Sequence, residues 1–145
     1  MCLVLFAHQP GAANPLIVAA NRDEFHARPT ATAAFWQDHP QVFAGRDLQA
    51  GGTWMGVSRS GRFAAITNYR DPDQTREAPR SRGELTTDFL TGTLSAHAYL
   101  NHVAEKSSDY AGFNLVIKEG DTLWYLSNGA DAPRPRQLLP GVYGL

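Results

Sequence analysis

The residue type with the clearest chemical potential stands at the second position of the chain. Cys2 is the only cysteine among 145 residues and directly follows Met1. Cleavage of Met1, which a small second residue permits, would leave one residue with both a thiol and a free α-amino group. An α-amino group titrates near neutral pH, so it can accept the thiol proton. Cys2 is therefore predicted to be a nucleophile for carbonyl carbon, the alternative being a small buried apolar residue that begins a strand.

Polar side chains that could assist such a nucleophile follow further along the chain. Asp23 could orient the ammonium group and the thiolate, while Asn21 or Asn68 could donate an amide N–H to the oxyanion of a tetrahedral intermediate. The polar run that contains Asn21 and Asp23 could instead be only a turn held by local hydrogen bonds. Asp23, Glu24 and His26 could also chelate a metal, but three neighbouring ligands in one loop are weak support, so no metal is expected.

Two apolar runs should bring these polar residues beside the thiol. Residues 2–7 and 16–20 are short, continuous apolar segments with turn-forming residues between them. Together they predict an antiparallel hairpin, in which the end of the second strand lies next to the start of the first. The hairpin would carry residues 21–24 back towards Cys2.

Arginine and tryptophan side chains are the candidates for binding a substrate. Arg70 and Arg82 belong to an arginine-rich stretch, and with Arg22 they could pair with a carboxylate or phosphate group. Trp54 would suit an apolar acyl or ring group. Asn21 is a further candidate for a substrate contact. A solvated arginine-rich loop and plain core packing of the tryptophan are the alternatives.

The rest of the chain alternates short apolar runs with turns and then changes to helical patterns. Strands are expected at residues 41–44, 54–58, 63–68, 113–118 and 123–127 and from 141 onward. Turns or loops are expected at residues 28–36, 45–47, 50–53 and 71–79 and in a proline-rich tail before 141. Ser81 and Glu84 have capping-box spacing at the start of one helix, and a second helix is expected after Ser95. The order predicts one α+β domain over residues 1–145, with a helical layer packed on sheet.

Composition and charge exclude several classes of function. The formal net charge is −1, with acidic and basic residues interspersed, which provides no basic surface for nucleic acid. A single cysteine rules out a disulfide framework. The opening apolar run is too short for the core of a signal peptide or for a spanning helix. We therefore expect a cytoplasmic protein without an integral membrane segment or a cofactor, acting on a small-molecule substrate or ligand.

Short motifs spread over the whole chain carry a family resemblance. They are MCLVLF at 1–6, AANRDEF at 19–25, RP at 28–29, AGRD at 44–47, GGTWMG at 51–56, TNYR at 67–70, SRG at 81–83 and GFN at 112–114. In this order they resemble the NRDE family, which is related to the transport and Golgi organisation 2 protein. The resemblance implies an αββα sandwich like that of N-terminal nucleophile (Ntn) hydrolases, with Cys2 as the nucleophile.

A more distant similarity is to the choloylglycine hydrolases and the penicillin acyltransferase group. Asp23 and Asn68 match an Asp and an Asn of their pattern, whereas Ala20 takes the place of their Arg. The resemblance implies a cysteine amidohydrolase or acyl transferase for a small amide, ester or thioester. The alternatives are a non-catalytic carrier for haem, acyl-CoA or lipid, and an inactive truncated remnant. Because the resembled family is longer, the chain is expected to be its N-terminal portion, with part of the sandwich beyond Leu145.

Overall fold

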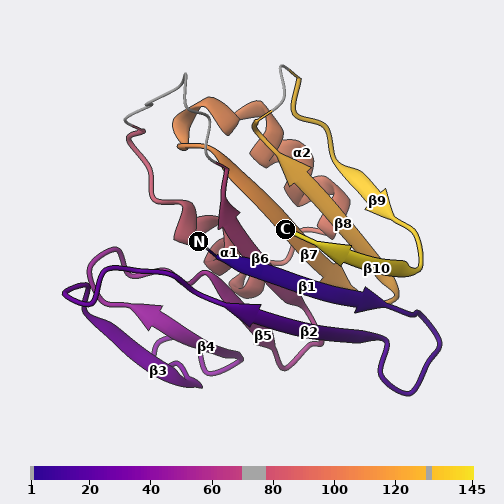
Figure 1. The fold of residues 1–145 in the computed structure, drawn as a ribbon, viewed down its shortest axis with the longest axis horizontal. Helices are drawn as coiled ribbons and strands as arrows, with labels where there is room; N and C mark the ends of the chain where they lie inside the picture. Colours follow the sequence, from indigo (N-terminus) through magenta and orange to yellow (C-terminus); the bar gives the residue numbers. More distant parts are fainter. Residues whose placement is uncertain (1, 70–77, 130–131) are drawn as a thin grey trace.

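The computed structural model describes residues 2–69, 78–129 and 132–145. Within these ranges the chain forms two antiparallel sheets and two α-helices, as predicted for an α+β protein. The helices pack on one face of the larger sheet, and the smaller sheet packs on its other face (Figure 1). The described chain is therefore built in three layers, in the order helix, sheet and sheet.

The smaller sheet combines the N-terminal hairpin with the last strand of the chain. Its order is β10-β1-β2, with β1 at Leu3–His8, β2 at Leu16–Asn21 and β10 at Gly141–Gly144. The predicted hairpin is confirmed, because β1 and β2 pair antiparallel with Leu3 opposite Asn21. The strand expected at the end of the chain is also present and pairs with the other edge of β1.

The larger sheet has the order β3-β4-β5-β6-β7-β8-β9 among the described residues. Its strands are β3 (Thr30–Phe35), β4 (Val42–Asp47), β5 (Met55–Ser58), β6 (Phe63–Asn68), β7 (Phe113–Glu119), β8 (Thr122–Ser127) and β9 (Arg136–Leu138). The strands expected from apolar runs are all present, with small shifts of their bounds. Apolar runs therefore identify the strands that carry the core.

Three predictions of turns or loops are wrong. β3 lies in the stretch 28–36, for which a loop is predicted. Every residue of this edge strand is exposed, so its sequence lacks the alternation of apolar and polar residues that marks a half-buried strand. In β9, which lies in the proline-rich tail, only Leu138 is buried. β4 continues through Arg46 to Asp47, where a turn is predicted, because pairing with β3 supplies partners for these residues. Most of the loop expected at residues 71–79 lies outside the described residues.

Both predicted helices are present, and each begins after a serine cap. They are α1 (Arg82–Thr91) and α2 (Ala96–Glu105), and a short 3-10 helix, η1 (Ser107–Asp109), follows α2. The hydroxyl groups of Ser81 and Ser95 accept backbone N–H groups of the first helical turns, which satisfies donors that a helix leaves unpaired. Glu84 accepts a hydrogen bond of 2.6 Å from the hydroxyl of Tyr110. The start of α1 is thereby tied to the segment that leads into β7.

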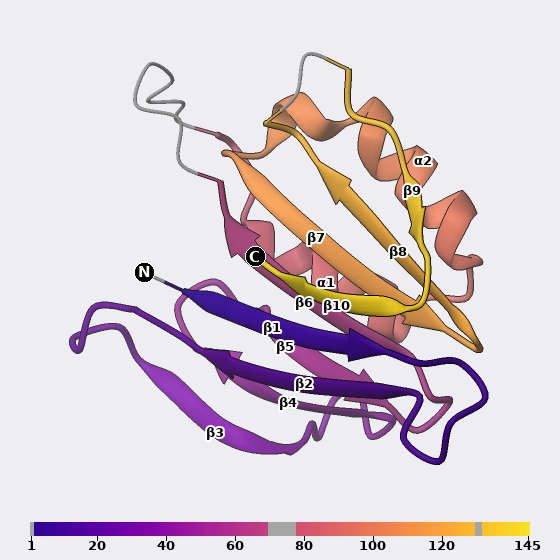
Figure 2. The same ribbon diagram turned by 45° about the vertical axis from the view of Figure 1, so that its right-hand side comes forward.

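Two clusters of buried apolar side chains hold the layers together. Phe89 of α1 and Leu100 of α2 belong to the cluster between the helices and the larger sheet. Val4 and Phe6 of β1 belong to the cluster between the two sheets, together with Val116 of β7. Figure 2 shows the smaller sheet running across the larger one on the side away from the helices. The larger sheet is therefore covered on both faces.

The outer face of the smaller sheet is apolar and open to solvent. Leu3 and Leu5 are each 47% exposed, Ile17 is 54% exposed and Val142 is 78% exposed. These side chains point away from the larger sheet because successive residues of a strand point to opposite faces, and Val4 points inwards. One apolar face of the described chain is thus left without a covering layer.

Arg62, directly before β6, connects the larger sheet to both helices. Its guanidinium donates to three carbonyl oxygens at the end of α1 and in the following loop, at 2.8 to 3.0 Å. It also donates to the carboxylate of Glu119 at 2.5 Å, and Glu119 accepts the N–H of Ala96 at the start of α2 at 2.9 Å. A single cation therefore satisfies carbonyls that the end of α1 leaves unpaired.

Replacing Arg62 with methionine should lower the free energy of unfolding by about 3 kcal/mol, because the carboxylate of Glu119 and the carbonyl oxygens would lose a charged donor. Urea unfolding followed by circular dichroism measures the change. The matched control is Arg134→Met, at an exposed position, which should stay within about 0.5 kcal/mol of the wild type. Equal losses in the two variants would contradict this role of Arg62.

Candidate active site

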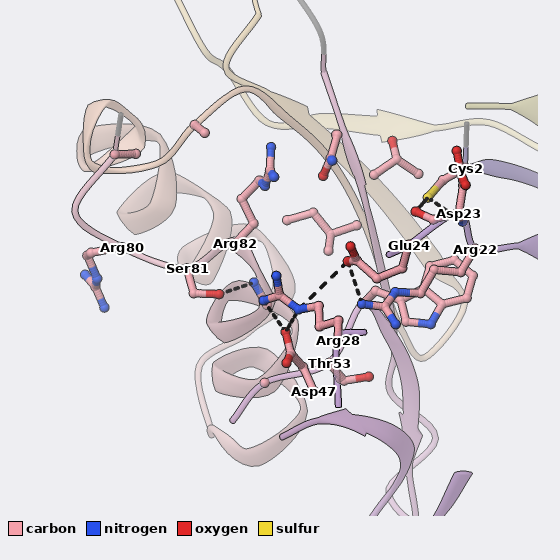
Figure 3. A pocket seen from close by; sticks show the side chains of 18 residues that line it. Cys2, Arg22, Asp23, Glu24, Arg28, Asp47, Thr53, Arg80, Ser81 and Arg82 are labelled. Atoms are coloured by element: carbon pink, nitrogen blue, oxygen red, sulfur yellow. Dashed lines mark hydrogen bonds and ion pairs between the residues drawn. The ribbon is translucent and has the colours of Figure 1, made fainter. Parts of the chain in front are cut away.

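A cavity of about 300 Å³ lies where the first hairpin ends above the larger sheet (Figure 3). Its walls come from five parts of the chain: the ends of the first hairpin with the loop after β2, the end of β4 with the loop before β5, the end of β6, the start of α1 with the residues before it, and Ala111 before β7. The lining residues discussed below are Cys2, Arg22, Asp23, Glu24, Arg28, Asp47, Gly52, Thr53, Trp54, Asn68, Ser81, Arg82 and Gly83. The fold thus brings five segments, distant in the sequence, to one cavity.

Cys2 faces this cavity because of its position directly before β1. Side chains two residues apart in a strand point to the same face, so Cys2 points the same way as Val4 and Phe6, which face the larger sheet. The Sγ atom of Cys2 accepts the backbone N–H of Asp23 at 3.4 Å, and the thiol donates to the backbone carbonyl of Asp23 at 3.8 Å. The hairpin therefore brings Asp23 next to the sulfur, and the backbone of Asp23 makes the contact.

The two candidate amide donors occupy different positions. Asn21 lies at the end of β2, where its Oδ1 accepts the backbone N–H of Leu3 at 2.9 Å. It closes the end of the hairpin and is absent from the cavity lining. Asn68, at the end of β6, is exposed and lines the cavity. Of the two, only Asn68 lines the cavity together with Cys2.

Four charged side chains form a series of ion pairs along the cavity. Glu24 accepts a hydrogen bond from Arg22 at 3.0 Å and lies 3.9 Å from Arg28. Arg28 donates its Nε and Nη2 groups to one oxygen of Asp47 at 2.9 and 2.6 Å. Figure 3 shows these contacts running from one side of the cavity to the other. The four side chains are only 15% to 29% exposed, so water screens them less than it screens a surface pair.

Asp47 is the most buried member of this series. Burial acts to raise the pKa of its carboxyl group, but hydrogen bonds from Arg28 and from the backbone N–H groups of Gln49 and Ala50 outweigh it and hold the pKa below its ordinary value. The hydrogen bond to Asp47 also raises the pKa of Arg28. The pairing of β3 with β4 brings these two residues together, since Thr30 lies opposite Asp47.

Arg82 differs from Arg22 and Arg28 because no ion pair joins it to a carboxylate in the part of the chain that the structure describes. Its Nη1 donates to the backbone carbonyl of Gly112 at 3.0 Å. Burial lowers the pKa of its guanidinium, and the charges of Glu24 and of the Cys2 thiolate act in the opposite direction. A guanidinium stays charged at neutral pH, so Arg82 brings a cation to the cavity.

Two glycines let the loop before β5 lie directly on the first turn of α1. A Cβ atom at Gly52 would lie 2.6 Å from the carbonyl group of Gly83, which leaves no room for a larger residue. The N–H of Thr53 donates to the carbonyl of Gly83 at 3.3 Å, and the hydroxyl of Thr86 donates to the carbonyl of Thr53. These contacts fix Trp54, the next residue, beside the start of the helix.

Most of the predicted site residues lie around this cavity. Those that line it are Cys2, Arg22, Asp23, Trp54, Asn68 and Arg82. Asn21 is not among them, and Arg70 lies outside the described residues. Within the described ranges, no three His, Cys, Asp or Glu side chains are arranged to hold a metal ion. Glu24, considered above as a metal ligand, is bound by Arg22 and Arg28.

The sequence reasoning missed Arg28 and Asp47 as parts of the site. The sequence predicts turns or loops at both positions. The two residues meet because β3 pairs with β4, and β3 has no buried residue that would identify it as a strand. A usable signal was the presence of both residues in short motifs, Arg-Pro at 28–29 and AGRD at 44–47. A half-buried ion pair between them would follow only from recognising the strand at 30–35.

The architecture defines an α+β protein in which the thiol of Cys2 lines a cavity between a hairpin and a helix start. Comparison with known sequences then identifies the family. The chain belongs to the transport and Golgi organisation 2 family, whose sequence model matches residues 1–145. The resemblance to the NRDE family is thereby confirmed.

Relatives of the chain include proteins from mammals and from a fly. The transport and Golgi organization 2 homologs of Mus musculus and Homo sapiens are each 40% identical over 157 residues, which cover 100% of this chain and 56% of the relative. The protein of the same name from Drosophila melanogaster is 35% identical over 132 residues, covering 82% of this chain and 46% of the relative. The chain spans about half the length of the curated relatives it matches.

Neither α1 nor α2 has the length and apolar character of a membrane-spanning helix, and no other candidate occurs in the described residues.

The Arg28–Asp47 pair should stabilise the fold in a pH-dependent way. Because the pKa of Asp47 is lowered by folding, its contribution is complete above about pH 4 and is lost as the pH falls through the folded value. Asp47→Asn should cost about 1.5 to 3 kcal/mol at pH 7 and should flatten the loss of stability below about pH 4. Urea unfolding of both proteins over a series of pH values measures this.

The control for that series is Asp38→Asn, which removes the more exposed pair between Asp38 and Arg46. The Asp38 side chain is 48% exposed, so this variant should lose less stability than Asp47→Asn at pH 7. Equal losses in the two variants, or wild-type acid dependence in Asp47→Asn, would contradict the assignment.

Proposed function

We propose that the chain is a cysteine N-terminal nucleophile enzyme, an amidohydrolase or acyl transferase that acts on a small amide, ester or thioester. The observation that carries this proposal is the presence of Cys2, Asn68 and Arg82 around one cavity. A nucleophile, an amide donor and a cation are groups that acyl transfer uses. Because a reactive thiol requires reducing conditions, we place the enzyme in the cytoplasm.

The α-amino group of Cys2, released by removal of Met1, is the proposed base. It takes the thiol proton while the sulfur attacks the carbonyl carbon, and the carbonyl π electrons move to the oxygen. When the tetrahedral intermediate collapses, the bond to the leaving amine, alcohol or thiol breaks, and the α-ammonium group returns the proton to that leaving group. Water or a second acceptor then attacks the thioester with the same base, which releases the product and restores the thiol.

Two donors support the charges that form in this reaction. The backbone N–H of Asp23, 3.4 Å from Sγ, stabilises negative charge on the sulfur. The side-chain amide of Asn68 is the proposed donor to the oxyanion of the tetrahedral intermediate. Asn21 acts indirectly, because its bond to Leu3 holds the end of the hairpin that carries Cys2.

Arg82 and Trp54 define the proposed substrate. Arg82 has N–H donors beyond the one bound to Gly112, and no carboxylate of the described residues pairs with it, so it suits a carboxylate or phosphate group of the substrate. Trp54 offers an apolar wall for the acyl part. Arg22 is bound to Glu24, so we give it the role of positioning that carboxylate in the cavity.

We further propose that the described layers belong to the αββα sandwich that the family resemblance implies. Helix, sheet and sheet are three of its four layers. The exposed apolar residues Leu3, Leu5 and Val142 lie on the face that the fourth, helical layer would cover. The greater length of the mouse and human relatives supports the interpretation of this chain as an N-terminal portion.

Intact-mass measurement tests the nucleophile. The purified chain should lack Met1, and incubation with p-nitrophenyl acetate should add one acetyl group, because only Cys2 combines a thiol with an adjacent base. The acetyl group should be absent from Cys2→Ala. A retained Met1, or equal acetylation of the two proteins, would contradict the mechanism.

Replacing Arg82 with glutamine tests the substrate class. For an acyl-glycine amide, which carries a carboxylate, kcat/KM should fall about tenfold to a hundredfold, since a charge-assisted pair is lost. For the matching acyl-ethanolamine amide, which has no charge, kcat/KM should change little. Arg59→Gln, outside the cavity, is the control for both substrates. Equal effects of Arg82→Gln on the two amides would rule out an anion-binding role.

A further inference from the structure

A second cavity, of about 720 Å³, lies between the smaller sheet and the half of the larger sheet that contains β4 and β5. Its walls are mainly apolar and include Val18 of β2, Phe43 of β4 and Met55 of β5. Figure 2 shows β2 running across β4 and β5, which accounts for a space bounded by both sheets. Trp54 lines this cavity and the one at Cys2, so it separates an apolar space from a charged one.

Lys118 gives this apolar cavity one buried cation. The residue is 9% exposed and lines the cavity. It points between the sheets because it lies opposite Phe63 and Leu123, which both belong to the cluster between the sheets. Its ammonium group donates to the carbonyl of Gly120, and no carboxylate of the described residues forms an ion pair with it. Burying an ammonium group without an anion is costly, so the site favours an anionic partner.

The other basic residues around this cavity do not change the preference of Lys118 for an anion. Arg62 also lines the cavity, but its guanidinium is occupied by Glu119 and by backbone carbonyls. On β1, His8 lies opposite Leu16 of the cavity wall but is not itself among the lining residues. His8 is 2% exposed, and its Nδ1 has no hydrogen-bond partner among the described residues. Of the cations that line the cavity, Lys118 is therefore the one without a carboxylate partner among the described residues.

We propose that this second cavity binds a medium-chain alkyl monocarboxylate, with the alkyl chain against Val18, Phe43 and Met55 and the carboxylate on Lys118. Apolar walls with one charged group suit a ligand that has an apolar body and a single anionic end. A cavity of about 720 Å³ lies within the range of small-molecule sites, about 300 to 1,000 Å³. Binding here involves no chemistry at Cys2, so the proposal does not rest on the proposed enzymatic function.

Calorimetric titration of the 145-residue chain with decanoate and decanol tests the proposal, because the two ligands share the chain and differ in the charge. Decanoate should bind the wild type, and each added methylene in the series hexanoate, octanoate, decanoate should strengthen binding about fourfold. Lys118→Met should weaken decanoate binding about tenfold or more and leave decanol binding within about twofold.

Three variants serve as controls. Lys106→Met changes the other lysine, at an exposed position on the far side of the larger sheet, and should leave both affinities unchanged. Ala33→Trp, at an exposed position of the cavity wall, should abolish binding of both ligands by filling the space. Cys2→Ala should bind decanoate like the wild type. Failure of decanoate to bind, equal binding by Lys118→Met, or loss of binding in Cys2→Ala would each overturn the proposal.

Discussion

The alternation of side chains along β1 is the constraint on which the rest of the site depends. Val4 and Phe6 are buried between the sheets, and this fixes the direction of every other side chain in the strand. Cys2 follows the same alternation and points into the cavity, whereas Asn21, opposite Leu3, belongs to the outer face. A slip of one residue would reverse both positions. Two apolar side chains of the core therefore decide which polar groups meet the thiol.

The charged groups of the cavity are arranged so that most of them neutralise one another. Arg22 and Arg28 share Glu24, and Arg28 also binds Asp47, which leaves Arg82 as the cation without a carboxylate among the described residues. Such a series orients its members through fixed hydrogen bonds and makes each position depend on the next. The recognition of a charged ligand would then fall mainly on Arg82. Arg22 and Arg28 instead hold the carboxylates of the cavity in place, although nothing in the sequence distinguishes them from Arg82.

The sequence was informative where burial leaves a pattern. The apolar runs of the first hairpin and the serine caps of both helices predicted the segments that hold Cys2 and Arg82. It was uninformative where the structure depends on pairing between exposed strands, as in β3, which brings Arg28 to Asp47. The direction of individual side chains could not be predicted either. A motif shows that Asn21 and Asp23 are close in the sequence, but not which face of the sheet each side chain occupies. The cavity at Lys118 likewise depends on how two sheets cross.

The open face of the smaller sheet has a consequence for the behaviour of the chain in solution. Leu3, Leu5, Ile17 and Val142 present a contiguous apolar surface, and the formal net charge is only −1 with an isoelectric point near 6.5. Molecules with so little net charge repel one another weakly near neutral pH. This surface therefore favours self-association, and moderately alkaline buffer or a charged residue at position 142 would be a direct means to keep the chain dispersed.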